Sequence, residues 1–213
     1  MKTKLVAMLA GLAALIAVSS ALAATIGGTS GDDRLPGTMA ADEIRAYAGN
    51  DFANARAGDD LVRLGAGDDT AQGDNGNDTV YGGSGQDRVR AGNGDDVVWG
   101  GSGDDAVYGS NGADQLHGGS GNDIVLGGPG SDRLWAGPGA DRVTGGPGDD
   151  TLHALAADDA PDVLDCGPGS DTAKVLSTER ASTTFRSCEV VMVIVSPSGD
   201  DQAAEGDRDA DAS

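Results

Sequence analysis

The feature that most constrains this chain is a nine-residue repeat. Residues 28–153 divide into 14 consecutive units of nine residues with no insertion. Within a unit the sixth place is always Asp, the fourth is Gly in 13 of the 14 units, and the eighth is always aliphatic or Ala. A period this short is typical of repeat architectures, in which neighbouring units support one another because no single unit can bury a core of its own.

Each unit is predicted to be a glycine-rich turn followed by a very short strand. The unit at residues 118–126, with the sequence GGSGNDIVL, shows the pattern. Glycines allow backbone angles with positive φ and leave the carbonyls of a turn unobstructed. Places seven to nine are polar, apolar and polar in outline, which predicts a three-residue strand with one inward side chain.

The composition limits both the core and the partners. The chain has 213 residues, 36 of them Gly, with 3% aromatics and a formal charge of -21. Without residues 1–23, which resemble a signal peptide, 12 Lys+Arg remain against 35 Asp+Glu, a charge of -23. Nucleic acid and anionic membranes are poor partners for such a surface. A large apolar core is excluded, so bound cations are the expected source of further stability.

The turns carry the donor atoms of a hard cation site. Ca²⁺ takes roughly six to eight oxygen ligands, and a turn that exposes carbonyls beside an Asp carboxylate supplies them. Nitrogen and sulfur ligands are absent from the repeated turns, so zinc, copper and iron fit poorly. The sequence therefore predicts calcium as the bound ion.

The units resemble the GGxGxDxUx nonapeptide of the RTX, or haemolysin-type, calcium-binding repeat family. The resemblance implies an all-β fold, a right-handed parallel β-roll in which two nonads make one coil and strands alternate between two facing sheets. It also implies that Ca²⁺ lies between successive turns along each edge, held by the sixth-place Asp side chains and by carbonyls of the glycine-rich places. The Asp residues, including two from units after the regular repeat, are Asp33, Asp42, Asp51, Asp60, Asp69, Asp78, Asp87, Asp96, Asp105, Asp114, Asp123, Asp132, Asp141, Asp150, Asp162 and Asp171.

The predicted roll has about seven to eight coils and binds around ten calcium ions. Seven coils at the ~4.8 Å interstrand spacing would be about 34 Å long. Residues 25–27 fit places seven to nine of a preceding half-unit, so the mature chain is expected to begin with a strand that covers the first coil. The units at residues 37–45 and 46–54 keep little of the motif beyond the Asp, so the first two or three turns are expected to bind calcium weakly or not at all.

The N-terminus is predicted to direct export. Lys2 and Lys4 precede an apolar run over residues 5–18, and the small residues at 21–23 allow cleavage before Ala24. A membrane anchor is the alternative, but the run is shorter than the ~20 residues that a spanning helix needs. The mature protein is therefore expected to be secreted, without membrane insertion. Classical members of the family use an uncleaved C-terminal signal, so this route of export differs.

The last part of the chain is predicted to cap the roll. Cys166 and Cys188 would meet an oxidising compartment, where an even number of cysteines favours a disulfide over a metal pair or a reactive thiol. The expected domains are the signal peptide at 1–23, the repeat roll at 24–153, degenerate repeats with a disulfide-linked cap at 154–195 and an acidic disordered tail at 196–213. Residues 190–195 are expected to cover the last coil.

No enzyme signature accompanies the repeats. The sequence has no HExxH and no GxSxG, and it leaves no room for the toxin, protease, lipase or adhesin domain that most family members carry. The predicted function is calcium binding with a structural or adhesive role at the cell exterior. The alternative is a calcium-dependent folding or secretion accessory of a separate exported enzyme.

One column of aromatic residues is a candidate surface for a partner. Place nine of alternate units holds Tyr81, Trp99, His117 and Trp135, which are expected to project from successive strands of one sheet. Two interpretations remain open. The rings brace the short strands by stacking along the ladder, or they form a platform for a cell-surface polysaccharide or another exported protein.

Overall fold

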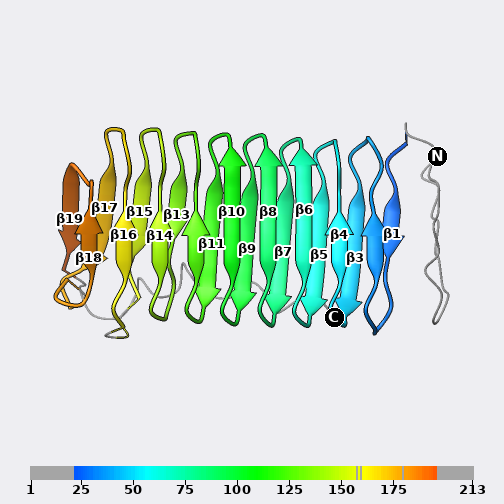
Figure 1. The fold of residues 1–213 in the computed structure, drawn as a ribbon, viewed down its shortest axis with the longest axis horizontal. Coiled ribbons are helices and arrows are strands. Elements are labelled where there is room, and N and C mark those ends of the chain that lie inside the picture. The colour runs from blue at the N-terminus through cyan, green and yellow to red at the C-terminus, as the bar shows by residue number, and fades with distance from the viewer. Residues whose placement is uncertain (1–21, 157, 159, 179, 196–213) are drawn as a thin grey trace.

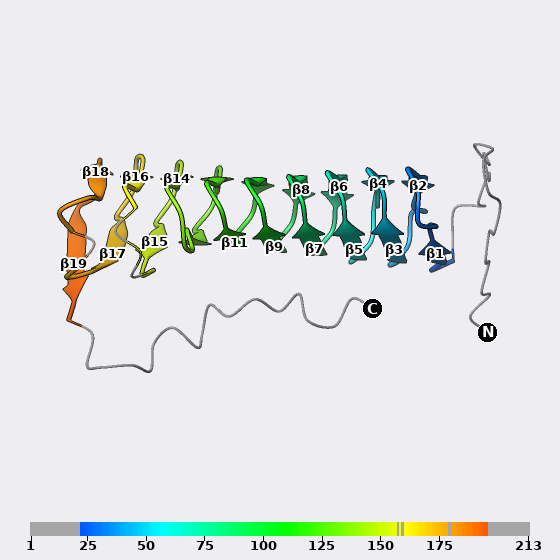
Figure 2. The ribbon, with the colours of Figure 1, turned by 90° about the horizontal axis from the view of Figure 1, so that it is seen from below.

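The protein is a parallel β-solenoid made of two facing sheets. The computed structural model describes residues 22–195 except 157, 159 and 179, and within them the regular elements are 19 strands. Figure 1 shows the strands side by side along the long axis of the molecule, and Figure 2 shows the two sheets as separate layers. Odd-numbered strands form a ten-stranded sheet and even-numbered strands a nine-stranded sheet, so the chain changes sheet after every strand.

The strands are short and evenly spaced along the chain. Those of the ten-stranded sheet are β1 (Thr25–Gly27), β3 (Glu43–Ala48), β5 (Leu61–Ala66), β7 (Thr79–Ser84), β9 (Val97–Ser102), β11 (Gln115–Ser120), β13 (Arg133–Trp135), β15 (Thr151–Ala154), β17 (Thr172–Leu176) and β19 (Val190–Ile194). Those of the nine-stranded sheet are β2 (Arg34–Pro36), β4 (Phe52–Asn54), β6 (Thr70–Asn75), β8 (Arg88–Asn93), β10 (Ala106–Asn111), β12 (Ile124–Leu126), β14 (Arg142–Thr144), β16 (Val163–Asp165) and β18 (Thr184–Arg186).

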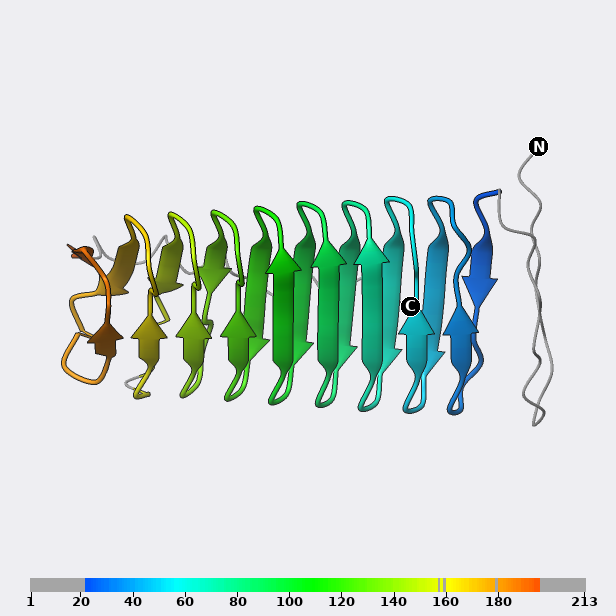
Figure 3. The same ribbon diagram turned by 45° about the horizontal axis from the view of Figure 1, so that its top comes forward.

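The register repeats the sequence period. Val80 on β7 pairs with Val98 on β9, and Val98 pairs with Leu116 on β11, a step of two nonads each time. The three residues inserted after β15 lengthen the step, so that Leu152 pairs with Ala173 on β17. Equivalent places therefore lie directly above one another through the stack. Figure 3 shows the strands of both layers following one another in line. This register places all sixth-place residues in two columns, one along each edge of the solenoid.

Many strands are longer than the sequence indicated. β3 and each strand from β5 to β11 have six residues instead of the expected three, because places one to three continue the ladder beyond the apolar centre. On β5 and β7, for example, Gly65 and Ala66 pair with Gly83 and Ser84. Burial alternates along such a strand, so place one also faces the interior. Leu64 and Ala91 occupy that place and are fully buried.

The interior is a narrow double row of small and aliphatic side chains. Place eight supplies one inward residue from every unit, such as Val107 on β10 and Leu116 on β11, and both are fully buried. Larger aliphatic residues lie mainly on the ten-stranded sheet. The N-terminal part of the other sheet contributes the smaller side chains of Ala53 and Ala71 to the core. A core this thin cannot offset the ordering of so many glycine-rich turns by burial alone.

The solenoid has about nine coils, more than the seven to eight expected from the sequence. β1 adds a half-coil at the N-terminal end, in the position expected for residues 25–27, with Ile26 paired to Ile44. At the other end residues 163–194 continue both sheets, and β19 pairs in parallel with β17. The apolar run at 190–194 is therefore the last strand of the ten-stranded sheet.

The predicted disulfide is present, and the predicted leader and tail are mostly outside the described chain. Cys166 and Cys188 are bonded, with 5.0 Å between their Cα atoms. None of the described segments is a helix of the length and apolarity needed to cross a bilayer. Residues 1–21 of the predicted signal peptide and the whole predicted tail at 196–213 lie outside the described residues.

Candidate metal centres

The sixth-place aspartates are buried at the points where turns enter strands. Each precedes its strand by one residue and directs its side chain inward, so that Asp114 and Asp123 are only 1% exposed. Asp33, in the first unit, is half-buried. The structure brings the predicted ligands together as two columns. One column contains Asp33, Asp51, Asp69, Asp87, Asp105, Asp123, Asp141 and Asp162, and the other contains Asp42, Asp60, Asp78, Asp96, Asp114, Asp132, Asp150 and Asp171.

Apart from Asp33, each of these carboxylates contributes one oxygen to a hydrogen-bond ladder. The backbone N–H of Asp96 donates to Oδ1 of Asp114, and the N–H of Asp114 donates to Oδ1 of Asp132, both at 2.9 Å. The same bond recurs along both columns at 2.6–3.0 Å. Sequence reasoning assigned the whole carboxylate to metal and missed this structural task, because the donor lies two nonads away in the chain.

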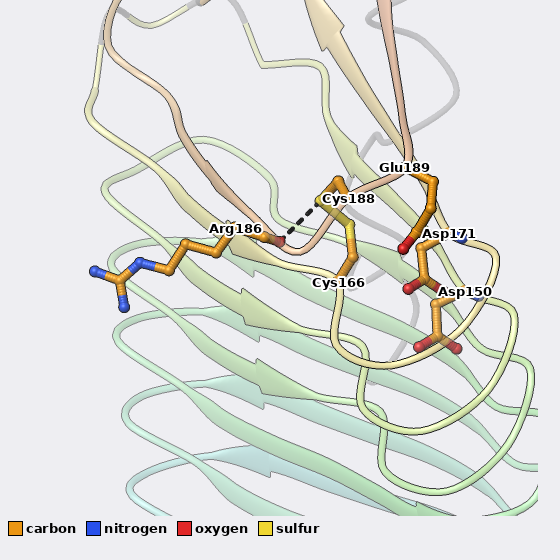
Figure 4. The surroundings of a disulfide bond; sticks show 6 residues. All are labelled: Asp150, Cys166, Asp171, Arg186, Cys188 and Glu189. Atoms are coloured by element: carbon orange, nitrogen blue, oxygen red, sulfur yellow. Dashed lines mark hydrogen bonds between the residues drawn. A yellow bond between two sulfur atoms is a disulfide. The ribbon is translucent and has the colours of Figure 1, made fainter.

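Glu189 ends one of these ladders. Its Oε2 atom accepts the N–H of Asp171 at 2.8 Å, in the place where a further Asp would otherwise lie. Figure 4 shows Asp150, Asp171 and Glu189 following one another along the edge beside the Cys166–Cys188 bridge. The only sequence signal for this role is the position of Glu189 next to Cys188, and it was not recognised as part of the site.

The second oxygen is buried without a hydrogen-bond partner. Among the described residues this holds for Oδ2 of Asp51, Asp60, Asp69, Asp78, Asp87, Asp96, Asp114, Asp123, Asp132, Asp141, Asp150 and Asp171. Buried polar atoms in folded proteins are nearly always hydrogen-bonded, and an unpaired buried charge is far more costly than an unpaired neutral group. A regular column of orphaned carboxylate oxygens is therefore the mark of a missing positive partner.

Burial also changes the proton affinity of these carboxylates. Desolvation raises the pKa of Asp87 to about 7 and that of Asp141 to about 8, and neighbouring carboxylates add to both shifts. The N–H donated to Oδ1 acts in the opposite direction but is outweighed by burial. Without a cation, these groups would hold a proton near neutral pH. A bound divalent ion would remove that penalty by favouring the charged form.

Backbone carbonyls complete an oxygen-lined space in each turn. A Cβ atom on Gly118 would lie 2.6 Å from Oδ2 of Asp123 and 2.5 Å from the carbonyl oxygen of Ala136 in the next coil. At place four, a Cβ on Gly85 would collide with the carbonyl oxygen of Gly67 in the preceding coil. Glycine thus keeps open a space that borders an unpaired carboxylate oxygen and carbonyls from adjacent coils.

The donor set fits calcium better than softer metals. Within the described part of the chain no three His, Cys, Asp or Glu side chains gather in a group that could hold a metal. Each turn instead provides one buried carboxylate and several carbonyls. A hard cation with many oxygen ligands suits this arrangement, whereas zinc in proteins relies on Cys, His and carboxylate side chains. The residues present therefore fit Ca²⁺.

The aromatic column lies on the outer face of the ten-stranded sheet. The rings of Tyr81, Trp99, His117, Trp135 and His153 stack in that order, with centroids 4.7, 5.5, 4.2 and 4.9 Å apart and interplanar angles of 3–18°. The register assigns the four expected residues to successive strands β7, β9, β11 and β13. His153, at place nine of the next strand β15, extends the stack by one ring.

Comparison with known proteins agrees with this geometry. The model of the RTX calcium-binding nonapeptide repeat matches ten overlapping segments, which together span residues 27–160. No curated protein matches the chain at a significant level. The matched span covers more than half of the chain and, apart from the turn of Asp171, includes the turns that contain the orphaned carboxylate oxygens. The chain therefore belongs to the RTX calcium-binding nonapeptide repeat family.

Proposed function

We propose that this protein is a secreted, non-enzymatic calcium-binding solenoid with a structural or adhesive role at the cell exterior. The observation that carries the proposal is the column of buried Oδ2 atoms without hydrogen-bond partners on each edge. A divalent cation beside each of these atoms would supply the missing positive charge. The proposed ligands are the sixth-place Asp side chains together with turn carbonyls of adjacent coils.

The geometry of the turns supports about ten ions. From the unit at residues 46–54 to the unit at 145–153, places two and four both adopt positive φ, as Tyr47 and Gly49 do in the first of these units. Six such turns stack on each edge, so five gaps between neighbouring turns lie on each edge. One ion in each gap would nearly cancel the charge of -23 left after removal of residues 1–23.

Export is supported by two independent features. The N-terminal sequence has a charged start, an apolar run and small residues before Ala24. The Cys166–Cys188 bridge is of the kind that persists in oxidising compartments outside the cytosol. Millimolar calcium in such surroundings would suit sites with dissociation constants on the order of 10⁻⁴ M, as in extracellular calcium modules.

The proposed role outside the cell rests on the shape of the solenoid and on the surfaces that it exposes. Two flat sheet faces and two regular edges form a rod with no attached domain in residues 22–195, apart from 157, 159 and 179. Such a rod suits a spacer or an adhesive element. In the aromatic column, neighbouring rings cover both faces of Trp99, which leaves ring edges for a partner and favours the bracing interpretation over a polysaccharide platform.

Calcium titration of the mature chain, followed by circular dichroism, tests the proposal. In chelator the chain should be expanded, because its charges repel and its core is thin. Millimolar Ca²⁺ should then induce β structure cooperatively, as expected when each coil is stabilised by its neighbours. Mg²⁺ at the same concentration should be much less effective, since it demands near-octahedral geometry and gives up water reluctantly. Equal β content with and without chelator would exclude the proposal.

A further inference from the structure

The two turns at the N-terminal end satisfy their carboxylates without a cation. Thr29 and Thr38 occupy place two, where most later units have Gly. The backbone N–H of each threonine donates to Oδ2 of the Asp in its own unit, Asp33 or Asp42, at 2.5 Å in both turns. This is the oxygen that lacks a hydrogen-bond partner in Asp51, the next sixth-place residue along the chain.

The threonine hydroxyl groups add further hydrogen bonds within the same two turns. Oγ1 of Thr29 donates to Oδ2 of Asp33 at 2.9 Å and accepts the N–H of Gly31 at 3.2 Å. Oγ1 of Thr38 likewise donates to Oδ1 of Asp42 at 3.0 Å and accepts the N–H of its own place-four residue at 3.1 Å. Each of these turns is therefore held by its own side chain.

Later turns form hydrogen bonds to the adjacent coil instead of within themselves. The place-four N–H of Gly67, for example, donates to the carbonyl of Ser84 in the next coil at 2.8 Å. From Tyr47 and Gly49 onward, places two and four lie at positive φ, whereas no residue of the first two turns does so. Tyr47 adopts φ 81° although it has a Cβ atom, so the change of turn type occurs between the second and third units.

We infer that Thr29 and Thr38 exclude calcium from the first two turns and take over its structural task there. This inference rests on the proposed function, because it assigns which turns bind calcium and which do not. A calcium ion needs a free anionic oxygen, but in both turns an N–H donor already points at Oδ2. Calcium uptake starts instead at the turn that contains Tyr47 and Asp51. Its glycine content alone would place this third turn with the first two, among the turns expected to bind calcium weakly or not at all.

Counting bound ions by native mass spectrometry in saturating calcium tests the assignment. Asp42→Asn should retain the wild-type number of ions, because its Oδ2 is paired by Thr38. Asp114→Asn, the matched change in a central turn, should lose at least one ion. Circular dichroism in the same buffer checks that both variants are folded. An equal loss in the two variants overturns the inference, and so does an unchanged count in Asp114→Asn, since the contrast between the turns then disappears.

Thr29→Gly gives a second test that adds a site instead of removing one. The first unit has Gly31 at place four, so this variant can adopt the later turn type and expose Oδ2 of Asp33. We expect one additional ion. Thr38→Gly is the control, because Ala40 at place four disfavours positive φ, and it should gain none. An unchanged count in Thr29→Gly would show that the threonine does not exclude the ion.

The outcomes separate this inference from the proposed function. A wild-type protein that binds no calcium at all would contradict the proposed function itself. A wild-type protein that binds about ten ions but loses one in Asp42→Asn would leave the proposed function intact and overturn only the role of the threonines.

Discussion

Outside the first two turns, most sixth-place aspartates use their two oxygens differently. In Asp132, Oδ1 accepts the N–H of Asp114 from the preceding coil, and the buried Oδ2 has no hydrogen-bond partner and is available to the proposed cation. Asn could accept the N–H but lacks the anionic oxygen that the proposed cation needs. Glu has the charge but a longer side chain, and in the ladders it appears only as Glu189, where no regular turn follows.

Ser110 provides a test of backbone strain at a single place-two residue. It has φ 88°, whereas most equivalent residues are glycines. A residue with a Cβ atom in this region costs about 1 kcal/mol. We expect Ser110→Gly to raise the free energy of unfolding in saturating calcium by up to about 1 kcal/mol, since the relieved strain is partly offset by the flexibility of glycine in the unfolded chain. Chemical denaturation followed by circular dichroism measures the difference.

The matched control for Ser110 is Ser102→Gly. Ser102 lies in a turn of the same kind, at place three, and does not adopt positive φ. This change relieves no strain and should leave stability equal or slightly lower. A gain of the same size in both variants would show that relief of strain at Ser110 is not its cause.

At the scale of the strand, stacking compensates for short length. A strand of three to six residues forms few ladder hydrogen bonds, and side chains at equivalent places therefore reinforce it along the stack. The rings on the ten-stranded sheet do so, and Arg63 extends the stack with its guanidinium carbon 5.6 Å from the Tyr81 ring centroid. On the opposite face Asn93 donates to Asn75 at 2.9 Å and accepts from Asn111 at 2.8 Å. Both ladders follow directly from the 18-residue register.

Trp99→Ala should destabilise the calcium-bound fold without changing calcium binding. Trp99 stacks on Tyr81 on one side and on His117 on the other. Each aromatic pair is worth about 0.5–1.5 kcal/mol beyond its burial, so a loss of about 1–3 kcal/mol is expected. Gln115→Ala, an exposed position on the neighbouring strand β11, should have little effect. If Trp99→Ala instead kept its stability and lost retention on insoluble polysaccharide, the platform interpretation would be correct.

The disulfide is expected to hold the last coil in place. It links Cys166, after β16, to Cys188, just before β19, across 22 residues. Closing a loop of that length is worth about 3 kcal/mol in the chain-entropy model. In Cys166→Ala/Cys188→Ala, hydrogen exchange should therefore accelerate over residues 172–194 and remain unchanged over β5 to β11. Reductant should have the same effect on the wild type and none on the double variant. Uniform acceleration along the chain would contradict a local role.

At the scale of the whole molecule, charge segregation controls when the solenoid can form. Acidic side chains fill the two edge columns, while the sheet faces carry few acids and hold Arg63, Arg88 and Arg133. The edges therefore repel themselves along the full length of the stack unless protons or cations neutralise them. We therefore expect folding and neutralisation of the edges to occur together.

The pKa shifts predict an inverted pH response in the absence of calcium. The folded pKa of Asp60, Asp87, Asp96 and Asp132 is raised to about 7, well above the usual value of 3.8, chiefly by burial. A raised carboxylate pKa stabilises the fold at low pH, and this contribution is lost as pH rises through the folded pKa. Calcium-free protein should thus show more β structure at pH 5 than at pH 8 by circular dichroism.

Protons and Ca²⁺ should compete for the same buried carboxylates. At a fixed calcium concentration at which the protein is folded at both pH values, equilibrium dialysis should therefore find fewer bound ions at pH 5 than at pH 8. A number of bound ions that does not depend on pH would show that these aspartates are not the groups that bind the ion.

Much of this protein could be predicted from periodicity. The 14 aspartates at one place define the two columns of proposed ligands. The resemblance to a nonapeptide family implies two parallel sheets, which the structure confirms. The aromatic column follows from register alone, and the Cys166–Cys188 bridge follows from the cysteine count and the predicted export. Such features are accessible because a strict repeat makes every local conformation the same and leaves only the stacking to be inferred.

Features that depend on contacts between coils could be seen only in the tertiary structure. Which carboxylate oxygen joins a ladder and which is left over is determined by a backbone N–H 18 residues away, and no local pattern encodes it. The six-residue strands extend through glycines that appear in the sequence as turn residues. The change of turn type at Tyr47 follows the last turn closed by threonine hydrogen bonds, and these bonds form only once the turn is closed. The sequence repeat thus determines which residues lie above one another in the stack. The hydrogen-bond partners of the ladder atoms depend on the geometry of the neighbouring coil.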